Sequence, residues 1–328
     1  MKKHNLIIRF TVAIILLILT VLFAISTGVA AISIKDIIEI FGGGGSDTTR
    51  AILFTLRLPR IIQAAVVGMG LSIAGTFFQG LLRNPMADSY VLGVSTGASF
   101  GATIAIVLGL GMLGMGFLSF VMALATMYVV YTLAKSGTKV SMSSMLLAGI
   151  TISAFLSSII SMLMLLNHQE FIRIAFWTMG GFSLVLWQDV LFSAPVIIIG
   201  SFILYLFARD LNAMITGEEV AHHLGIDTDI VKKIILAVGS LITAAAVCVS
   251  GVIGFVGLII PHICRIFVGP DNRILVPFSA IMGAVFLVLA DTLARTLIAS
   301  EIPVGIITSA LGGPFFLVLL VKNKKKGM

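Results

Sequence analysis

Residues 10–24 read FTVAIILLILTVLFA and contain no charged side chain. Similar runs recur along the 328-residue chain, which is 59% hydrophobic and only 11% Asp, Glu, Lys and Arg. A soluble domain carries about 25% charged residues, so in water this chain would expose apolar patches that soluble monomers rarely tolerate. The runs are continuous rather than alternating, which argues against a membrane β-barrel. The composition therefore predicts an all-α protein that crosses a membrane many times.

A helix that crosses a bilayer needs about 20 apolar residues, and the chain has room for about ten such spans. The first run resembles a secretory signal followed by the small residues Gly28 and Ala30, but it is long for a signal and more spans follow. Ten spans leave almost nothing for a soluble domain, so residues 1–328 are expected to form one transmembrane domain. We expect the spans at residues 6–30, 61–82, 91–113, 115–134, 141–166, 190–208, 232–249, 252–268, 274–294 and 304–321.

The distribution of Lys and Arg predicts the orientation of the chain. If the N-terminus is cytoplasmic, 15 of the 21 Lys and Arg residues fall on the inner side, so both termini are expected inside. The net charge of +7 then reflects inner loops rather than nucleic-acid binding. Trp177 and Trp187 fall in one outer segment, which we expect to lie along the membrane interface. Cys248 and Cys264 lie in apolar runs and are expected to be packing residues.

Two spans carry small residues at helical spacing. On the third span the repeat predicts close approach of another helix; its members are Gly93, Gly97 and Gly101. On the fifth span four residues form one small, weakly polar face; they are Gly149, Ser153, Ser157 and Ser161. One interpretation of the second face is close packing, with each hydroxyl bonded to its own helix. The other interpretation is a helix face that lines a translocation path.

The sequence contains no residue pattern for a catalytic or metal site. It has neither the phosphate-binding P-loop pattern nor the HExxH zinc pattern, and the adjacent His222 and His223 point in different directions. No catalytic, cofactor or metal-binding residue is therefore expected, and a membrane enzyme is disfavoured. The spans also lack a chain of ionisable residues, which weighs against the alternative of a stand-alone ion-coupled carrier. Asp291 and Arg295 lie one helical turn apart, so they are expected to pair, with an outward-reaching Arg295 head group as the alternative.

The longest inner loop, about residues 209–231, contains a predicted short helix. Thr216 is a candidate N-cap, with Glu219 three residues later as in a capping box, and Gly225 is a candidate C-cap. Between these ends lies a short apolar face of Val220, Ala221 and Leu224. A solvated connector needs neither capped ends nor an apolar face. The loop is therefore interpreted as a docking site for a soluble partner, with a plain connector as the alternative.

Positive charge also gathers on the outer side, just before the second span. Arg57 and Arg60 flank Pro59, which suits the first turn of a helix. Both guanidinium groups are expected to face outward, against the positive-inside bias. Together with Arg295 they predict a patch for an acidic protein partner. Contact with lipid phosphate is the alternative.

Several motifs follow one another along nearly the whole chain. They are RLPR at 57–60, Gly75 with Gln79, RNPMAD at 83–88, LGVSTGA at 92–98, GFVGLIIPH at 254–262 with Arg265, Ala290-Asp291 with Arg295, EIPVG at 301–305 and GGP at 312–314. In this order the motifs resemble those of the FecCD-type permease subunits of ABC importers for iron-siderophores, haem and vitamin B12. Met86 replaces the Leu that is usual in the family, which conserves volume, and Ser89 stands where Pro is common.

This resemblance implies an all-α permease with ten spans, paired as a homodimer or close heterodimer in the cell membrane. It implies two cytoplasmic ATPase subunits, which bind the ATP, and an extracytoplasmic binding protein that delivers the substrate. Ferric siderophore is the first expected substrate, followed by haem and cobalamin.

The resemblance also implies roles for the residues singled out above. Docking of the binding protein falls to Arg57, Arg60 and Arg295, and lining of the path to the small face of the fifth span. Coupling to the ATPase falls to Thr216, Gly217, Glu218, Glu219, Ala221, Leu224 and Gly225.

Overall fold

The computed structural model describes residues 3–28, 39–40, 42, 44, 46–136, 139–298 and 301–324. Within them, seven helical segments are long and apolar enough to cross a membrane. These are α1 (Lys3–Ser26), the continuous run of α3 (Asp47–Ala51), η1 (Ile52–Arg57) and α4 (Leu58–Leu81), α6 (Met112–Ala134), α7 (Met142–Leu166), α9 (Trp187–Leu206), α12 (Thr228–Ser250) and α14 (Asn272–Ala294). Three shorter apolar stretches lie in α5 (Val94–Val107), α13 (Val256–Val268) and α15 (Val304–Lys324). The seven long and three shorter segments occupy the ten predicted spans, which confirms the all-α membrane class.

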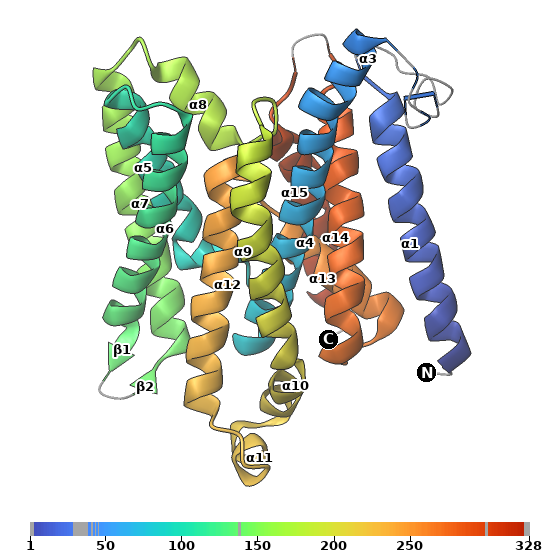
Figure 1. The fold of residues 1–328 in the computed structure, drawn as a ribbon. Helices are drawn as coiled ribbons and strands as arrows, with labels where there is room; N and C mark the ends of the chain where they lie inside the picture. The colour runs from blue at the N-terminus through green and yellow to red at the C-terminus, as the bar shows by residue number, and fades with distance from the viewer. Residues whose placement is uncertain are drawn as a thin grey trace.

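Short elements connect the spans at the two ends of the bundle. They are η2 (Ser89–Leu92), α8 (Phe171–Met179), α10 (Ala208–Thr216), α11 (Glu218–His223) and the paired two-residue strands β1 (Lys135–Ser136) and β2 (Lys139–Val140). Figure 1 places the N-terminal mark, the β1–β2 pair and α11 toward one end, and α3 and α8 at the opposite end. We call the first the inner end and the second the outer end. The C-terminal mark also lies toward the inner half, as the even number of spans predicts.

Several spans differ from their predicted bounds by a few residues, and at two of them the structure shows a local cause. The second begins earlier, because Ser46 caps α3 by accepting a hydrogen bond from the Thr49 amide at 3.2 Å and the helix then continues through η1. The eighth begins later, at Val256, because Gly251 (φ +63°) and Phe255 (φ +70°) adopt left-handed backbone conformations. The chain therefore crosses from α12 to α13 through non-helical backbone at residues 251–255.

Helix α4 forms the centre of the bundle. Most of its residues are buried, whereas few residues of α7 and α1 are. It packs against α9, α12, α13 and α14. Two glycines permit the closest of these contacts, because a Cβ at Gly68 would overlap the Gly283 carbonyl of α14 and one at Gly75 would overlap the Gly257 carbonyl of α13. Helices in lipid associate through such close backbone approach.

The predicted packing role of the glycines on the third span is confirmed. A Cβ at Gly97 would collide with the Thr126 side chain, and one at Gly101 with the Leu118 carbonyl. Both neighbours belong to α6, so this face of α5 seats α6. Gly93 has φ +80° and starts α5 in a conformation that other residues rarely adopt. Cys248 and Cys264 are buried free thiols, as predicted.

Candidate functional site

The inner end carries a projecting segment that we call the inner foot, residues 208–225. It consists of α10, the bend at Gly217 and α11 (Figure 1). Leu211 and Met214 of α10 are buried against the bundle. Helix α11 lies beyond them, at the lowest point of the molecule in Figure 1. The predicted short inner helix is therefore present, but a second short helix precedes it.

The ends of α11 differ in part from the prediction. Thr216 is the last residue of α10 and its hydroxyl donates to the Asn212 carbonyl at 3.2 Å, so its predicted N-cap role is wrong. Gly217 precedes α11 instead, without a side-chain cap, and Glu219 therefore closes no capping box. Gly225 has φ +79° and donates to the His222 carbonyl at 2.9 Å, which confirms a glycine stop at the C-terminal end. Thr216 belongs to the amphipathic helix α10 that precedes α11, so α11 begins at Glu218, one residue later than predicted.

The surface of the inner foot is apolar at its tip. Ala221 is fully buried, whereas Leu224 is 67% exposed and Val220 46% exposed. Glu218 pairs with Lys232 of α12 at 2.7 Å, which ties the start of α11 to the bundle. The expected apolar face is thus divided: Ala221 fixes the helix, and the two larger side chains are left uncovered in this chain. Exposed leucine on an otherwise charged loop is the pattern expected of a docking surface.

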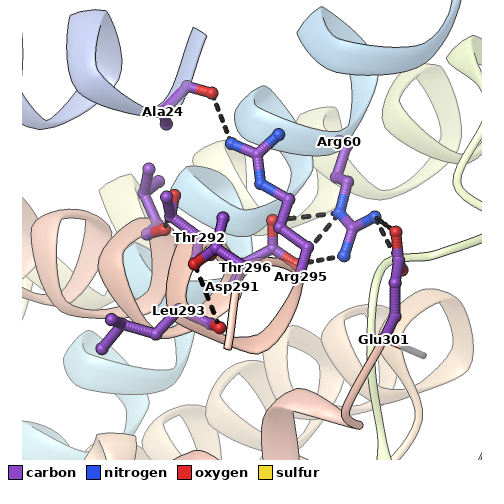
Figure 2. A network of polar contacts seen from close by, with 9 residues as sticks. Ala24, Arg60, Asp291, Thr292, Leu293, Arg295, Thr296 and Glu301 are labelled. Carbon is purple, nitrogen blue, oxygen red and sulfur yellow. Dashed lines mark hydrogen bonds and ion pairs between the residues drawn. The ribbon is translucent and has the colours of Figure 1, made fainter. Parts of the chain in front are cut away.

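A buried ion-pair cluster occupies the outer end where α4 and α14 meet (Figure 2). Arg60, in the first turn of α4, places its Nε 3.0 Å from both carboxylate oxygens of Asp291 and its Nη2 2.9 Å from Oδ1. Its Nη1 lies 3.0 Å from both oxygens of Glu301. The Asp291 side chain is 2% exposed and that of Glu301 39% exposed. Arg60 thus joins a buried carboxylate to one at the surface.

The other two outer arginines also turn inward. Arg57 donates to the Ile25 carbonyl and Arg295 to the Ala24 carbonyl, both at the C-terminal end of α1. Arg57 is 6% exposed and Arg295 7%. The expectation that the guanidinium groups of Arg57 and Arg60 face outward is therefore wrong for this chain: Arg60 binds the two carboxylates, and Arg57 binds a carbonyl of α1. The last carbonyls of α1 attract Arg57 and Arg295 because they lack helical partners. The expected direct pair of Asp291 with Arg295 does not form, since the Asp291 carboxylate hydrogen-bonds to Arg60. The Arg295 charge still lies close enough to Asp291 to interact with it electrostatically.

The small face of the fifth predicted span lies on α7. Gly149 is buried, and a Cβ on Gly93 would come within 3.7 Å of its carbonyl. Ser153 is partly buried, and Ser157 and Ser161 are exposed. The Ser161 hydroxyl donates to the Ser157 carbonyl of its own helix at 2.9 Å. One end of the face therefore packs inside the chain, while the other end is open at its surface.

A groove of about 750 Å³ opens at the outer end, between α6, α8, α9 and the end of α12. Phe117, Phe176 and Phe192 line it together with other apolar side chains, and Arg173 and Glu301 add charge. Glu301 therefore borders both the arginine cluster and the groove. Trp187 donates from its indole nitrogen to the Phe54 carbonyl at 2.7 Å at this same end.

The outer cluster contains two residues that sequence reasoning missed as partners of Arg60. Asp291 follows Arg60 by 231 positions and Glu301 by 241, so no local spacing relates them. Among the described residues, no group of three His, Cys, Asp or Glu side chains is placed to hold a metal ion. The two ends of the molecule thus offer an exposed apolar surface at the inner foot and a set of paired charges at the outer cluster.

Comparisons with known proteins agree on one class of membrane protein. The profile of the FecCD transport family matches residues 16–322. The cobalamin import system permease protein BtuC of Halobacterium salinarum is 45% identical over 278 residues, which cover 84% of this chain and 75% of that protein. The hemin transport system permease protein HmuU of Yersinia pestis is 36% identical over 320 residues, 95% of each chain.

A solved structure has the same fold over almost the full length. It is an inward-facing conformation of an ABC transporter assigned to the metal-chelate type. Its chain is 31% identical, with a TM-score of 0.87, and the match covers 96% of this chain and 99% of that one. The likeness therefore extends to the helix arrangement that carries both the inner foot and the outer cluster.

Proposed function

Because this chain belongs to the FecCD transport family, we propose that it is the membrane subunit through which an ATP-driven importer moves one particular bulky metal chelate. The family is one of ABC importer permeases for iron chelates, haem or cobalamin, and these permeases are transport components of the cell membrane rather than enzymes. The substrate, the ATPase partner and the docking residues of this chain are proposals.

The inner foot is the observation that carries the proposal. Leu224 and Val220 expose apolar surface on a short helix that projects from the inner end, and an ATPase subunit with an apolar cleft would cover them. Glu218, Glu219 and Gly225 belong to the same helix or its end, whereas Thr216 belongs to α10. ATP binding would move the ATPase pair, and the foot would pass that movement to the helices, shifting the balance between inward-open and outward-open states.

The substrate proposed for this chain is inferred from its relatives and not from the residues that line the path. A cobalamin permease at 45% identity and a hemin permease at 36% support a metallo-macrocycle, with cobalamin first. Ferric siderophore, which ranked first on the sequence, becomes the next candidate. The small face of α7, with Ser157 and Ser161 exposed, is the proposed lining of the path once a second permease subunit faces it.

The outer cluster is the proposed docking region for an acidic binding protein. Arg57, Arg60 and Arg295 are largely buried and partnered within the chain, so docking requires rearrangement around them. Glu301, the exposed partner of Arg60, is the group that an incoming carboxylate would displace. Replacing Arg57 by Gln should weaken binding-protein affinity while the same change at the exposed Arg173 should not. Equal affinities for both variants would remove the arginines from docking.

Reconstitution tests the function directly. The chain is placed in vesicles with its ATPase and binding protein, and uptake of cobalamin, haem and a ferric hydroxamate is measured with and without ATP. We expect ATP-dependent uptake of one of these chelates. Uptake that persists without the ATPase and collapses with the proton gradient would instead establish the stand-alone ion-coupled carrier.

A further inference from the structure

The inner foot is tied to the start of α14 by one side chain. Asn212 of α10 donates from Nδ2 to Asp271 Oδ1 at 2.7 Å. The Oδ1 atom of Asn212 accepts a hydrogen bond from the Asn272 backbone amide at 2.9 Å and another from Asn272 Nδ2 at 2.7 Å. Asn272 is 1% exposed, whereas Asn212 and Asp271 are partly buried, so the contact lies at the edge of the protein interior. The side-chain amide of Asn212 is thus hydrogen-bonded both to Asp271, the residue before α14, and to Asn272, the first residue of α14.

Asp271, which accepts the hydrogen bond from Asn212, is also bonded to the start of α14. Its carboxylate caps α14 by accepting from the Arg273 amide at 3.0 Å, and the Arg273 guanidinium holds it at 2.7 Å. Hydrogen bonds from the Arg273 side chain, joined by those from its backbone and from Asn212, lower the pKa of Asp271 to about 2. The group is therefore a carboxylate at neutral pH, and Asn212 meets a charged acceptor, which makes the hydrogen bond stronger than a neutral one.

A second connection joins the foot to α4. Arg83 follows the end of α4 and donates from Nη2 to the Met214 carbonyl of α10 at 2.6 Å. Its φ of +48° is left-handed, which a residue other than Gly adopts at a cost of about 1 kcal/mol or more. Gly would relieve that strain but would lose the guanidinium that reaches α10. Both contacts therefore lead from α10 to the same pair of helices, α4 and α14.

Helices α4 and α14 are held together along their length and at the far end. Gly68 and Gly283 bring their backbones into direct contact near the middle. At the outer end the Arg60–Asp291 pair joins them again, 2.9 Å apart and buried (Figure 2). Packed interiors deform little, so a displacement applied at the inner end of this pair reaches the outer cluster.

We propose that Asn212 is a positioning residue that transmits movement of the inner foot to α14, and through the α4–α14 pair to the outer docking region. The inference rests on the proposed function, since that function supplies the ATPase that moves the foot. It adds a specific connection: foot, Asn212, the start of α14, and the Arg60–Asp291 pair.

A charge swap tests this connection. Asn212→Asp places a second carboxylate 2.7 Å from Asp271 and turns the contact repulsive. The double variant Asn212→Asp with Asp271→Asn restores one donor and one acceptor in the reverse direction, and Asn remains a good N-cap for α14. Asn167→Asp is the matched control, because the Asn167 amide bonds within its own helix, to the Leu163 carbonyl at 2.9 Å.

The measured quantity is the number of ATP molecules hydrolysed per substrate imported in reconstituted vesicles. We expect Asn212→Asp to raise this ratio about fivefold or more, the lower end of typical coupling between sites, and the double variant to return it toward the wild-type value. A merely structural defect would lower hydrolysis and import together and leave the ratio unchanged.

The possible outcomes separate the two levels of inference. If the wild-type protein imports its substrate and the Asn212→Asp ratio equals that of Asn167→Asp, the transmission role is overturned while the proposed function stands. The same conclusion follows if the double variant is as uncoupled as the single one. If the wild-type protein with its ATPase imports nothing, the proposed function fails and the transmission role falls with it.

Discussion

Removing the Arg60 guanidinium should destabilise the fold far more than removing its exposed partner. In Arg60→Ala, Asp291 loses both hydrogen bonds from Nε and the one from Nη2. Its side chain is 2% exposed, so water cannot replace them. Breaking a buried pair by deleting one partner costs about 3–5 kcal/mol. Glu301→Gln removes a charge that is 39% exposed and should cost less than about 1 kcal/mol.

A double variant separates the charge from the packing. Arg60→Met with Asp291→Leu replaces the ion pair by apolar groups, which is often neutral when the volumes are similar. The free energy of unfolding of the purified protein in detergent is the quantity to measure, with all variants in the same detergent. If Arg60→Ala and Glu301→Gln lose the same stability, or if the double variant is as unstable as Arg60→Ala, the cluster is not held by the buried pair.

Three further predictions follow from other parts of the chain. Leu224→Asp should abolish ATP-driven uptake without lowering thermal stability. The same change at Leu108, which is 66% exposed at the outer end, should leave uptake intact. Equal uptake by the two variants would rule out the foot as the ATPase contact. Gly75→Ala should reduce the free energy of unfolding by about 1–3 kcal/mol, because the added Cβ overlaps α13. Gly254→Ala, where no atom lies within 4 Å of the added Cβ, should leave the free energy of unfolding unchanged in the same assay. Because the pKa of Asp271 is lowered to about 2 from about 3.9 unfolded, the stability that wild type holds over Asp271→Asn should be constant above about pH 5 and vanish as the pH falls toward 2; a constant difference at all pH values would contradict that assignment.

The predictions that succeeded depend on local chemistry. Continuous apolar runs required helices that satisfy their own backbone in lipid, and all ten predicted spans contain apolar helix in the described residues. Gly97 and Gly101 correctly predicted a close contact between two helices, because only small residues permit such an approach. Gly225 follows the end of α11 as predicted, because glycine adopts the left-handed backbone that stops a helix and this preference does not depend on distant residues.

The predictions that failed concern partners distant in the chain. Arg57 and Arg295 look like surface charges in the sequence, yet both bind the last carbonyls of α1. Asp291 has Arg295 one turn away, yet it pairs with Arg60, because helix packing brings α4 against α14. Thr216 matched a capping pattern, yet α10 already included it.

The order of residues by itself determined that this protein is a helical membrane permease, where its ten apolar segments lie and where a short helix projects at one end; it also predicted which end faces inward. These properties follow from solvent and backbone hydrogen bonding, which act on neighbouring residues. The tertiary structure alone decided which charges are buried, which carboxylate each arginine binds and that Asn212 connects the foot to α14. Such pairings depend on how close two helices approach, and that distance is set by the packing of the whole bundle.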